Sequence, residues 1–141
     1  MTGPNLTIQR AARASHIPTD ATLRRWAHAT GVEGAVTVRY VGEIESRRLN
    51  REFRGKDHAT NVLSFPYSAK PLEGDLVICA PVVAREAREQ RKDVRARHAH
   101  MLVHGLLHLA GLDHERAAQA KRMESRERVI LARLGFPDPY A

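Results

Sequence analysis

Three histidines in one short segment have the residue type and spacing of a metal site. The segment from His104 to His114 reads HGLLHLAGLDH. His104 and His108 are four residues apart, so on an α-helix their side chains would share one face. Gly111 could end that helix in a left-handed turn and allow His114 to return to the same point. Three imidazoles leave a tetrahedral zinc ion one position for water, which is the layout of a catalytic site.

The histidine spacing matches the metzincin peptidase pattern except at one position. Both histidine gaps and the glycine agree, but Gly105 stands where those peptidases carry the glutamate that acts as general base. Because glycine cannot accept a proton, the segment favours a metal-activated water that acts on a substrate other than an ordinary peptide. A zinc peptidase that takes its base from another segment remains an alternative. Three imidazoles also bind nickel and copper, so these metals stay candidates beside zinc.

The remaining histidines show no comparable spacing to one another. We interpret three of them as surface residues, namely His16, His28 and His58. His98 and His100 precede the motif on the same expected helix. His100 lies four residues before His104, so it is a candidate fourth ligand. A solvated or substrate-facing position is the favoured interpretation of His100.

Composition indicates one soluble domain that spans residues 1–141. Apolar residues make up 43% of the chain and charged residues 28%, which is typical of globular proteins. No apolar run is long enough to cross a bilayer, and the first thirteen residues lack the pattern of a signal peptide. We therefore expect a cytoplasmic protein with no membrane partner. The single cysteine, Cys79, lies in an apolar run and should be buried.

The positive charge of the chain favours a polyanionic partner. Its formal net charge of +7 would suit nucleic acid, although an arginine-rich composition alone is weak evidence. Together with a hydrolytic metal site the charge becomes informative, because metal-activated water can attack a phosphodiester backbone. Arg54 lies in the polar loop 54–60 and could make a bidentate contact with phosphate. An ordinary exposed turn is the equal alternative for this loop.

Hydrophobic periodicity and turn residues predict an α+β fold with a small mixed sheet of about four strands and about five helices. The expected strands are 6–8, 35–41, 61–65 and 76–79, and the expected helices are 19–30, 43–53, 81–92, 94–110 and 115–134. Pro66 should stop the third strand, with a loop over 67–73. The apolar contacts of the second helix should be Ile44, Leu49 and Phe53.

The chain resembles the YbeY family of bacterial rRNA-maturation endoribonucleases in several blocks. Residues 104–114 meet every fixed position of the family hallmark, H-G-x-L-H-L-x-G-x-D-H. Residues 50–66 meet the block N-x-x-[FY]-R-G-K-D-x-x-T-[DN]-V-L-S-F-P. Residues 74–79 resemble the family strand G-D-I-x-I, and 123–135 resemble its final helix. One difference is Ala59, which stands where the commonest family text has proline.

The resemblance implies a single-domain zinc protein that cleaves single-stranded RNA. Family members are linked to maturation of the 16S rRNA 3′ end and to ribosome quality control. By this resemblance His104, His108 and His114 are the ligands of one zinc ion, and Arg54 is the arginine important for activity. The implied partners are rRNA and the ribosome or its small subunit, with a ribosomal protein or a GTPase as further candidates.

Our hypothesis from the sequence is therefore a zinc-dependent endoribonuclease. Metal-activated water would attack the phosphodiester, and Arg54 would neutralise the charge that develops on its oxygens. Asp113 would either orient a histidine ligand or cap the following helix. The general base is not assigned. The non-enzymatic alternative is a ribosome-assembly factor in which zinc only stabilises the fold.

Overall fold

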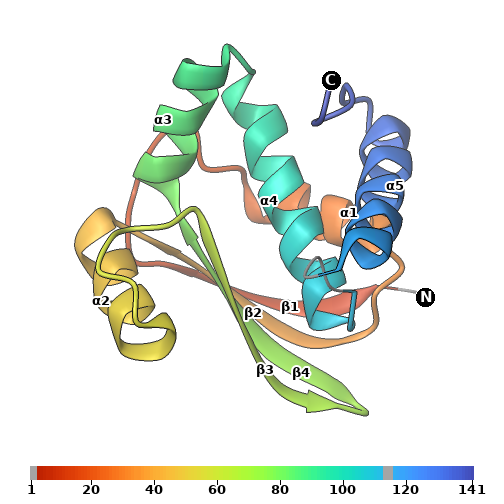
Figure 1. Cartoon of the computed structure of the whole chain (residues 1–141), viewed down its shortest axis with the longest axis horizontal. Helices are drawn as coiled ribbons and strands as arrows, with labels where there is room; N and C mark the ends of the chain where they lie inside the picture. Colours follow the sequence, from red (N-terminus) through yellow and green to blue (C-terminus); the bar gives the residue numbers. More distant parts are fainter. Residues whose placement is uncertain (1–2, 113–115) are drawn as a thin grey trace.

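Four strands form one mixed sheet in the computed structural model, which describes residues 3–112 and 116–141. The strands are β1 (Pro4–Arg10), β2 (Gly34–Val41), β3 (Val62–Ala69) and β4 (Leu72–Cys79). Their order in the sheet is β1-β2-β4-β3. β2 pairs in parallel with both β1 and β4, whereas β3 runs antiparallel to β4 at the edge (Figure 1).

Within the described residues, helices cover both faces of this sheet. They are α1 (Asp20–Ala29), α2 (Glu43–Arg54), α3 (Ala80–Gln90), α4 (Val94–Leu109) and α5 (Ala117–Arg133). Alternate residues of β4 separate the two faces: Leu76 and Ile78 join the large core with α1, α4 and α5, and Val77 and Cys79 join a smaller core with Leu49 of α2. The expected α+β fold is confirmed. No helix in the described part of the chain has the length and apolar character needed to span a bilayer.

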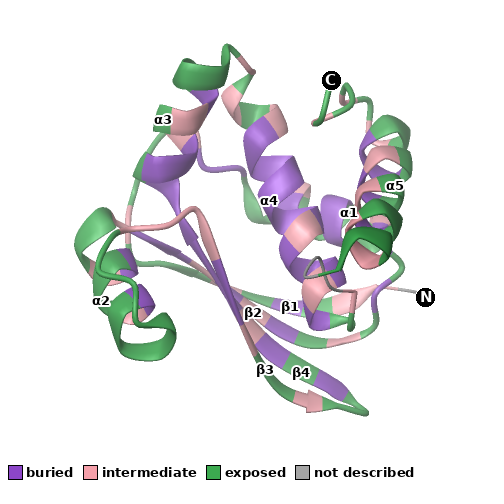
Figure 2. Cartoon of the chain, in the orientation of Figure 1, coloured by how far each residue is buried: buried purple, intermediate pink, exposed green. Residues whose placement is uncertain are grey.

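α4 is the most deeply buried helix and is flanked by the sheet and three other helices. It packs against β3 and β4, and also against α1, α3 and α5. From Arg97 to Leu109 every side chain of α4 is buried except those of His104 and His108 (Figure 2). Because these two residues are four apart, the only part of this stretch left accessible is one narrow stripe that carries two imidazoles.

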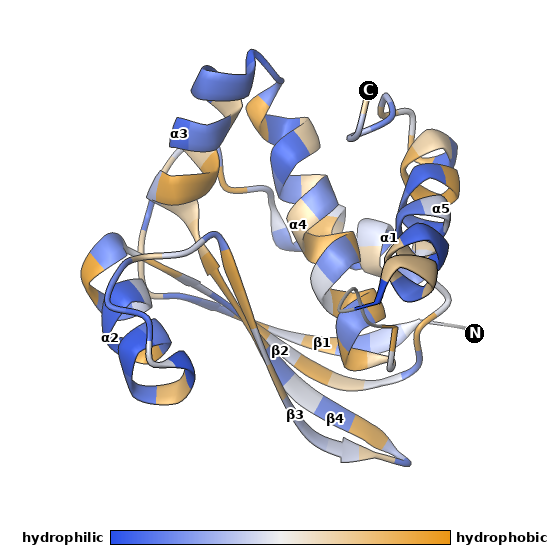
Figure 3. Ribbon diagram, viewed as in Figure 1, coloured by the Kyte–Doolittle hydropathy of each residue, from blue (hydrophilic) through white to orange (hydrophobic). Residues whose placement is uncertain are grey.

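The buried face of α2 is more polar than the sequence pattern indicated. Of the three expected apolar contacts, only Leu49 packs against the smaller core, whereas Ile44 and Phe53 are 89% and 61% exposed. The fully buried residues of α2 are instead Ser46 and Asn50, which share a helix face with Leu49. Figure 3 shows how hydrophilic this helix is compared with the strands beneath it. The prediction for Ile44 and Phe53 was therefore wrong.

Ser46 and Asn50 form hydrogen bonds to the backbone of the loop that follows α2. Ser46 Oγ donates to the carbonyl of Thr60 and accepts from its N–H, both at 3.0 Å. Asn50 Nδ2 donates to the carbonyl of His58 at 2.8 Å. The helix itself ends at Gly55, whose φ of 69° is the left-handed conformation that glycine adopts readily. The loop is thus held in place by hydrogen bonds to α2 rather than by apolar packing.

The β3–β4 hairpin is longer than expected. The sequence predicted that Pro66 would end the strand and that 67–73 would be a loop, but β3 continues through Pro66 and β4 already begins at Leu72. Proline is tolerated here because β3 is an edge strand and its register shifts between Pro66 and Ser68. The five helices, by contrast, begin and end within two residues of their expected bounds.

Ser46→Ala should lower the free energy of unfolding by about 1–3 kcal/mol, because Thr60 loses the partner of both its backbone groups. Denaturant titration of the purified protein would measure the change. Ser125→Ala on the exposed face of α5 is the matched control and should stay within about 0.5 kcal/mol of wild type. Equal effects of the two substitutions would contradict the anchoring role of Ser46.

Candidate metal centre

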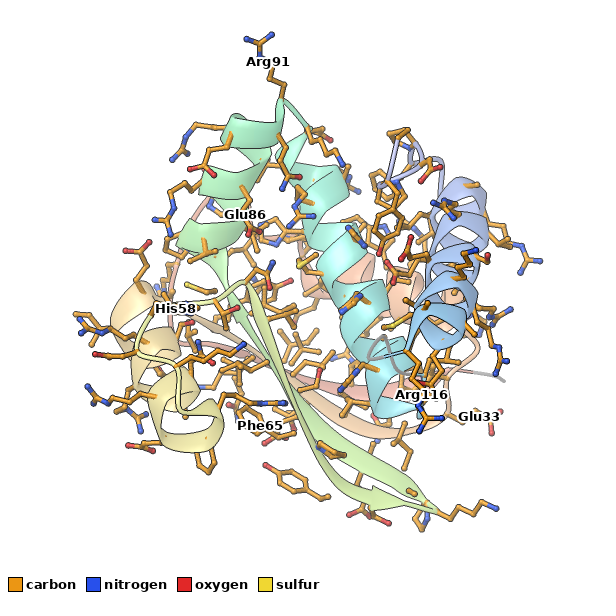
Figure 4. The ribbon with its side chains drawn as sticks, in the orientation of Figure 1. Glu33, His58, Phe65, Glu86, Arg91 and Arg116 are labelled. Atoms are coloured by element: carbon orange, nitrogen blue, oxygen red, sulfur yellow. The ribbon has the colours of Figure 1, made fainter. Side chains whose placement is uncertain are left out.

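A cavity of about 520 Å³ lies between α4, the end of α2 and β3. Its polar lining includes Arg54, Lys56, His58, Asn61, His104 and His108. Arg54 and the loop after it therefore face the same space as His104 and His108. The spacing of these residues in the sequence did not show that they meet. His58 belongs to the loop beside α2 (Figure 4) and is exposed, as expected.

His104 and His108 reach this cavity from successive turns of α4. Both are half-buried, and the rest of the helix packs against the sheet and its neighbours. After α4 the chain turns at Gly111, whose φ of 100° matches the turn expected from the sequence. His114 and Asp113 lie outside the described residues. The structure therefore brings together two of the three expected ligands and the turn that precedes the third.

Arg54 is held at the cavity by the edge strand opposite. Its Nη2 donates to the carbonyl of Ser64 at 2.9 Å, which joins the end of α2 to β3. In the same loop, Asp57 accepts two hydrogen bonds from Arg47, at 2.8 and 3.0 Å. The bond from Arg47 is the main cause that lowers the pKa of Asp57. The loop acid is thus paired with Arg47, while Arg54 and Lys56 contribute positive charge to the cavity lining.

Glu127 of α5 lies behind His104 and was not anticipated from the sequence. Its carboxylate is fully buried and contacts His100 Nε2 at 2.5 Å, His104 Nδ1 at 3.1 Å and the Tyr140 hydroxyl at 2.7 Å. Burial alone would raise the pKa of Glu127, but the hydrogen bonds from His100, His104 and Tyr140 outweigh it and lower the pKa to about 2. The carboxylate is therefore a fixed negative charge next to an expected metal ligand.

His100, His104 and Glu127 form a group that could hold a metal ion. Each offers one ligand atom, and these atoms lie within 4.8 Å of one another. Both carboxylate oxygens already accept hydrogen bonds, and only His104 of the three also lines the cavity. Metal-binding histidines commonly donate their second ring N–H to a carboxylate in this way. The donor set therefore suits a metal on the cavity side of His104, with Glu127 behind the ring.

The structure corrects the interpretation of His100 as solvated or substrate-facing, and it places His98 on the same helix. Both are buried, and His98 is fully enclosed. Burial is the main cause that lowers the pKa of His98 to about 3, so its ring is neutral. His16 is half-buried rather than a surface residue, because its Nδ1 lies 2.9 Å from His98 Nε2. His28 is exposed, as expected.

A signal for Glu127 was present in the sequence. The residue lies four positions after Met123 and three before Ile130, so helical spacing places it on the buried apolar stripe of α5. A carboxylate in such a stripe needs a partner, since an isolated buried charge is very costly. That partner comes from α4, and pairing between two helices is not visible in one sequence.

Gly105 packs against the sheet rather than facing the cavity. A Cβ at this position would lie 2.7 Å from Cδ2 and 3.0 Å from Cδ1 of Leu76, which is itself fully buried in β4. The position where the metzincin peptidases carry their glutamate is therefore closed here by the sheet. The chain therefore lacks the peptidase general base at position 105 for two reasons: glycine has no side chain, and the close packing on Leu76 leaves no room for one.

Comparisons with known proteins agree on one family. The family model described as Endoribonuclease YbeY matches residues 8–135. The Endoribonuclease YbeY of Aromatoleum aromaticum is 55% identical, over 96% of this chain and 92% of its own. That of Methylobacillus flagellatus is 48% identical, over 96% and 93%. The solution structure of TM1509 from Thermotoga maritima has a TM-score of 0.58 at 24% identity over 92% of both chains, which shows a shared fold.

Gly105→Glu would restore the peptidase sequence but should destabilise the protein by about 3 kcal/mol or more, because the side chain meets Leu76 in the buried interface. Ala132→Glu introduces the same residue on an exposed position of α5 and should be nearly neutral. Thermal and denaturant unfolding would measure both. If the glutamate variant does not fold, Gly105→Ala tests the same contact with a smaller loss. A stable glutamate variant that cleaves casein would contradict this account.

Proposed function

The chain belongs to the YbeY family of endoribonucleases, and on that premise we propose that it is a zinc-dependent enzyme that cleaves single-stranded RNA. The observation that carries the proposal is the cavity in which His104, His108 and Arg54 meet. We place its action in the cytoplasm, in maturation of the 16S rRNA 3′ end and in ribosome quality control. The substrate is then rRNA in the ribosome or small subunit, and a ribosomal protein or a GTPase directs the enzyme to it.

In this proposal His104, His108 and His114 hold one zinc ion, in competition with nickel and copper. The support is that His104 and His108 share the cavity and that the chain turns at Gly111 before His114. Zinc bound there supplies Lewis-acid chemistry, because it lowers the pKa of a coordinated water toward neutrality. The donor set fits this role, since imidazoles backed by a carboxylate are common around zinc.

Arg54 binds the phosphate and neutralises charge that develops on its non-bridging oxygens. A guanidinium suits this task because it presents two parallel N–H donors to two oxygens. The bond from Arg54 to the Ser64 carbonyl holds the side chain in place before substrate arrives, so less conformational entropy is lost on binding. Lys56 adds a second positive charge to the same cavity lining.

An aromatic pair next to the cavity supports single-stranded RNA as the substrate. Phe53 directly precedes Arg54, Phe65 directly follows Ser64, and the two rings meet edge to face with centroids 5.3 Å apart. Phe53 keeps 61% of its surface exposed. Unpaired bases stack on exposed aromatic rings, whereas the bases of a duplex are already stacked on each other. The ring therefore offers a place for a base beside the bound phosphate.

The proposed roles predict different losses at the metal and phosphate positions. His108→Ala and His114→Ala should lose both zinc and cleavage, because each removes a ligand. Arg54→Ala should keep zinc and lose cleavage by about 10²–10³-fold, as for loss of one charge-stabilising donor. Arg48→Ala, an exposed arginine on the same helix, is the matched control for charge. Metal analysis and cleavage of an rRNA precursor would measure these effects.

Three outcomes would contradict this function. Cleavage at the wild-type rate by Arg54→Ala would reject its role, and full zinc content in His108→Ala would reject the ligand set. Wild-type protein that binds zinc and ribosomes but cuts neither RNA nor casein would favour the assembly-factor alternative. His108→Ala and His114→Ala, which should be inactive, also report on contaminating nucleases, because cleavage that persists in both does not depend on the proposed metal ligands.

Phe53→Ala should weaken binding of a short single-stranded RNA by about 5- to 150-fold, which corresponds to about 1–3 kcal/mol for one stacked base. Ile44→Ala removes a more exposed apolar side chain from the other end of α2 and should leave binding unchanged. Fluorescence anisotropy with the labelled RNA would measure both. Equal affinities for the two variants would show that the Phe53 ring does not contact the RNA.

A further inference from the structure

Glu127 is a fully buried carboxylate that the proposed cleavage does not use directly. We infer that Glu127 is a positioning residue of the metal centre, which fixes the tautomer and orientation of the His104 ring and thereby raises the affinity of the centre for its metal. This inference rests on the proposed function, because it takes His104 as a ligand. It extends the site from the cavity to the last helix of the fold.

The hydrogen bonds of Glu127 determine where the proton of His104 lies. A carboxylate only accepts, so the His104 Nδ1 at 3.1 Å from Oε1 must carry a proton. The neutral ring then has its lone pair at Nε2, on the other side of the imidazole, and this is the atom that would hold the metal. The opposite tautomer would break the bond to Glu127. A negative charge behind the ring also stabilises a cation in front of it.

His100 is fully engaged as a link in the same network. Its Nε2 donates to Glu127 at 2.5 Å, and its Nδ1 then accepts from Arg97 Nη1 at 3.2 Å. The tautomer that satisfies the carboxylate is therefore also the one that satisfies the arginine. With one ring nitrogen protonated and the other bonded to a cation, His100 is a poor metal ligand. This assigns His100 and Glu127 to the support of the site and leaves His104 as its ligand.

The network continues from His100 back to the cavity through α3. Arg97 is buried, and its Nη2 donates to Glu86 at 2.6 Å. Figure 4 shows Glu86 on the side of α3 that faces α4. Glu86 in turn accepts from Asn61 Nδ2 at 3.1 Å, and Asn61 lines the cavity. A connected set of hydrogen bonds thus starts at one cavity residue, Asn61, and ends at another, His104.

Tyr140 provides a natural control for this inference. Its hydroxyl donates to the same Glu127 oxygen as His100, at 2.7 Å, but it does not contact His104. Tyr140→Phe therefore removes one hydrogen bond from the carboxylate while the charge and the His104 contact remain. Glu127→Gln removes the charge at nearly constant shape, and its amide can equally donate to His104, which no longer specifies one tautomer.

The decisive experiment compares these two variants of the full chain by zinc affinity and by tautomer. Zinc affinity is measured by competition with a chelator, and the His104 tautomer by long-range ¹H–¹⁵N correlation spectra of the metal-free protein. Glu127→Gln should bind zinc about 10- to 100-fold more weakly and show a mixed tautomer. Tyr140→Phe should match wild type in both. Excess zinc should restore RNA cleavage by Glu127→Gln.

Several results would overturn the inference. Wild-type protein with the proton of His104 on Nε2 would do so alone, even if Glu127→Gln fails to fold. Unchanged zinc affinity in Glu127→Gln would also do so. Complete loss of zinc in that variant, with zinc retained in His108→Ala, would make Glu127 a ligand instead. Failure of the proposed function looks different: no RNA is cleaved by any variant, whatever their zinc affinities.

Discussion

Close packing of α4 on the sheet is the constraint on which the site depends. A glycine at 105 lets the helix approach β4 until Leu76 fills the space that a side chain would take. The same helix is covered by α1 and α5, so between Arg97 and Leu109 only the stripe with His104 and His108 stays accessible. The two imidazoles point to one cavity because every other direction from the second half of the helix is occupied. The orientation of these two imidazoles is thus a consequence of core packing.

On the other side of the cavity, α2 and the loop after it are held by hydrogen bonds rather than by apolar packing. α2 has little apolar surface to bury, and its loop is held by Ser46 and Asn50 through bonds to backbone groups. Such bonds are directional, so they fix the loop in one conformation more closely than apolar contact alone would. Arg54 is then joined to the edge strand at Ser64. A closely packed helix thus holds the two histidines on one side of the cavity, and a polar scaffold holds Arg54 on the other.

Local patterns predicted the helices, the strand β2, the turn at Gly111 and a shared helix face for His104 and His108, because each depends on residues near one another in the chain. The errors came from contacts between distant segments. Pro66 is compatible with a strand only because β3 lies at the edge, and a sequence does not show strand order. α2 buries the face that carries Ser46 and Asn50, because both side chains bond to backbone groups of the loop. Ile44 and Phe53 lie outside this face and are exposed. Glu127 was missed because its partners lie on another helix.

The position of Glu127 links the candidate metal centre to the completion of the fold. Its carboxylate reaches His104 only when α5 is docked on α4, and burial without the histidines would leave an unpaired charge in the core. Docking of α5 and correct protonation of His104 therefore favour each other. A metal that binds the correctly protonated ring must in turn stabilise the docked helix, because binding to the folded form shifts the folding equilibrium. The C-terminal helix is then as much a part of the site as the helix that carries the histidines.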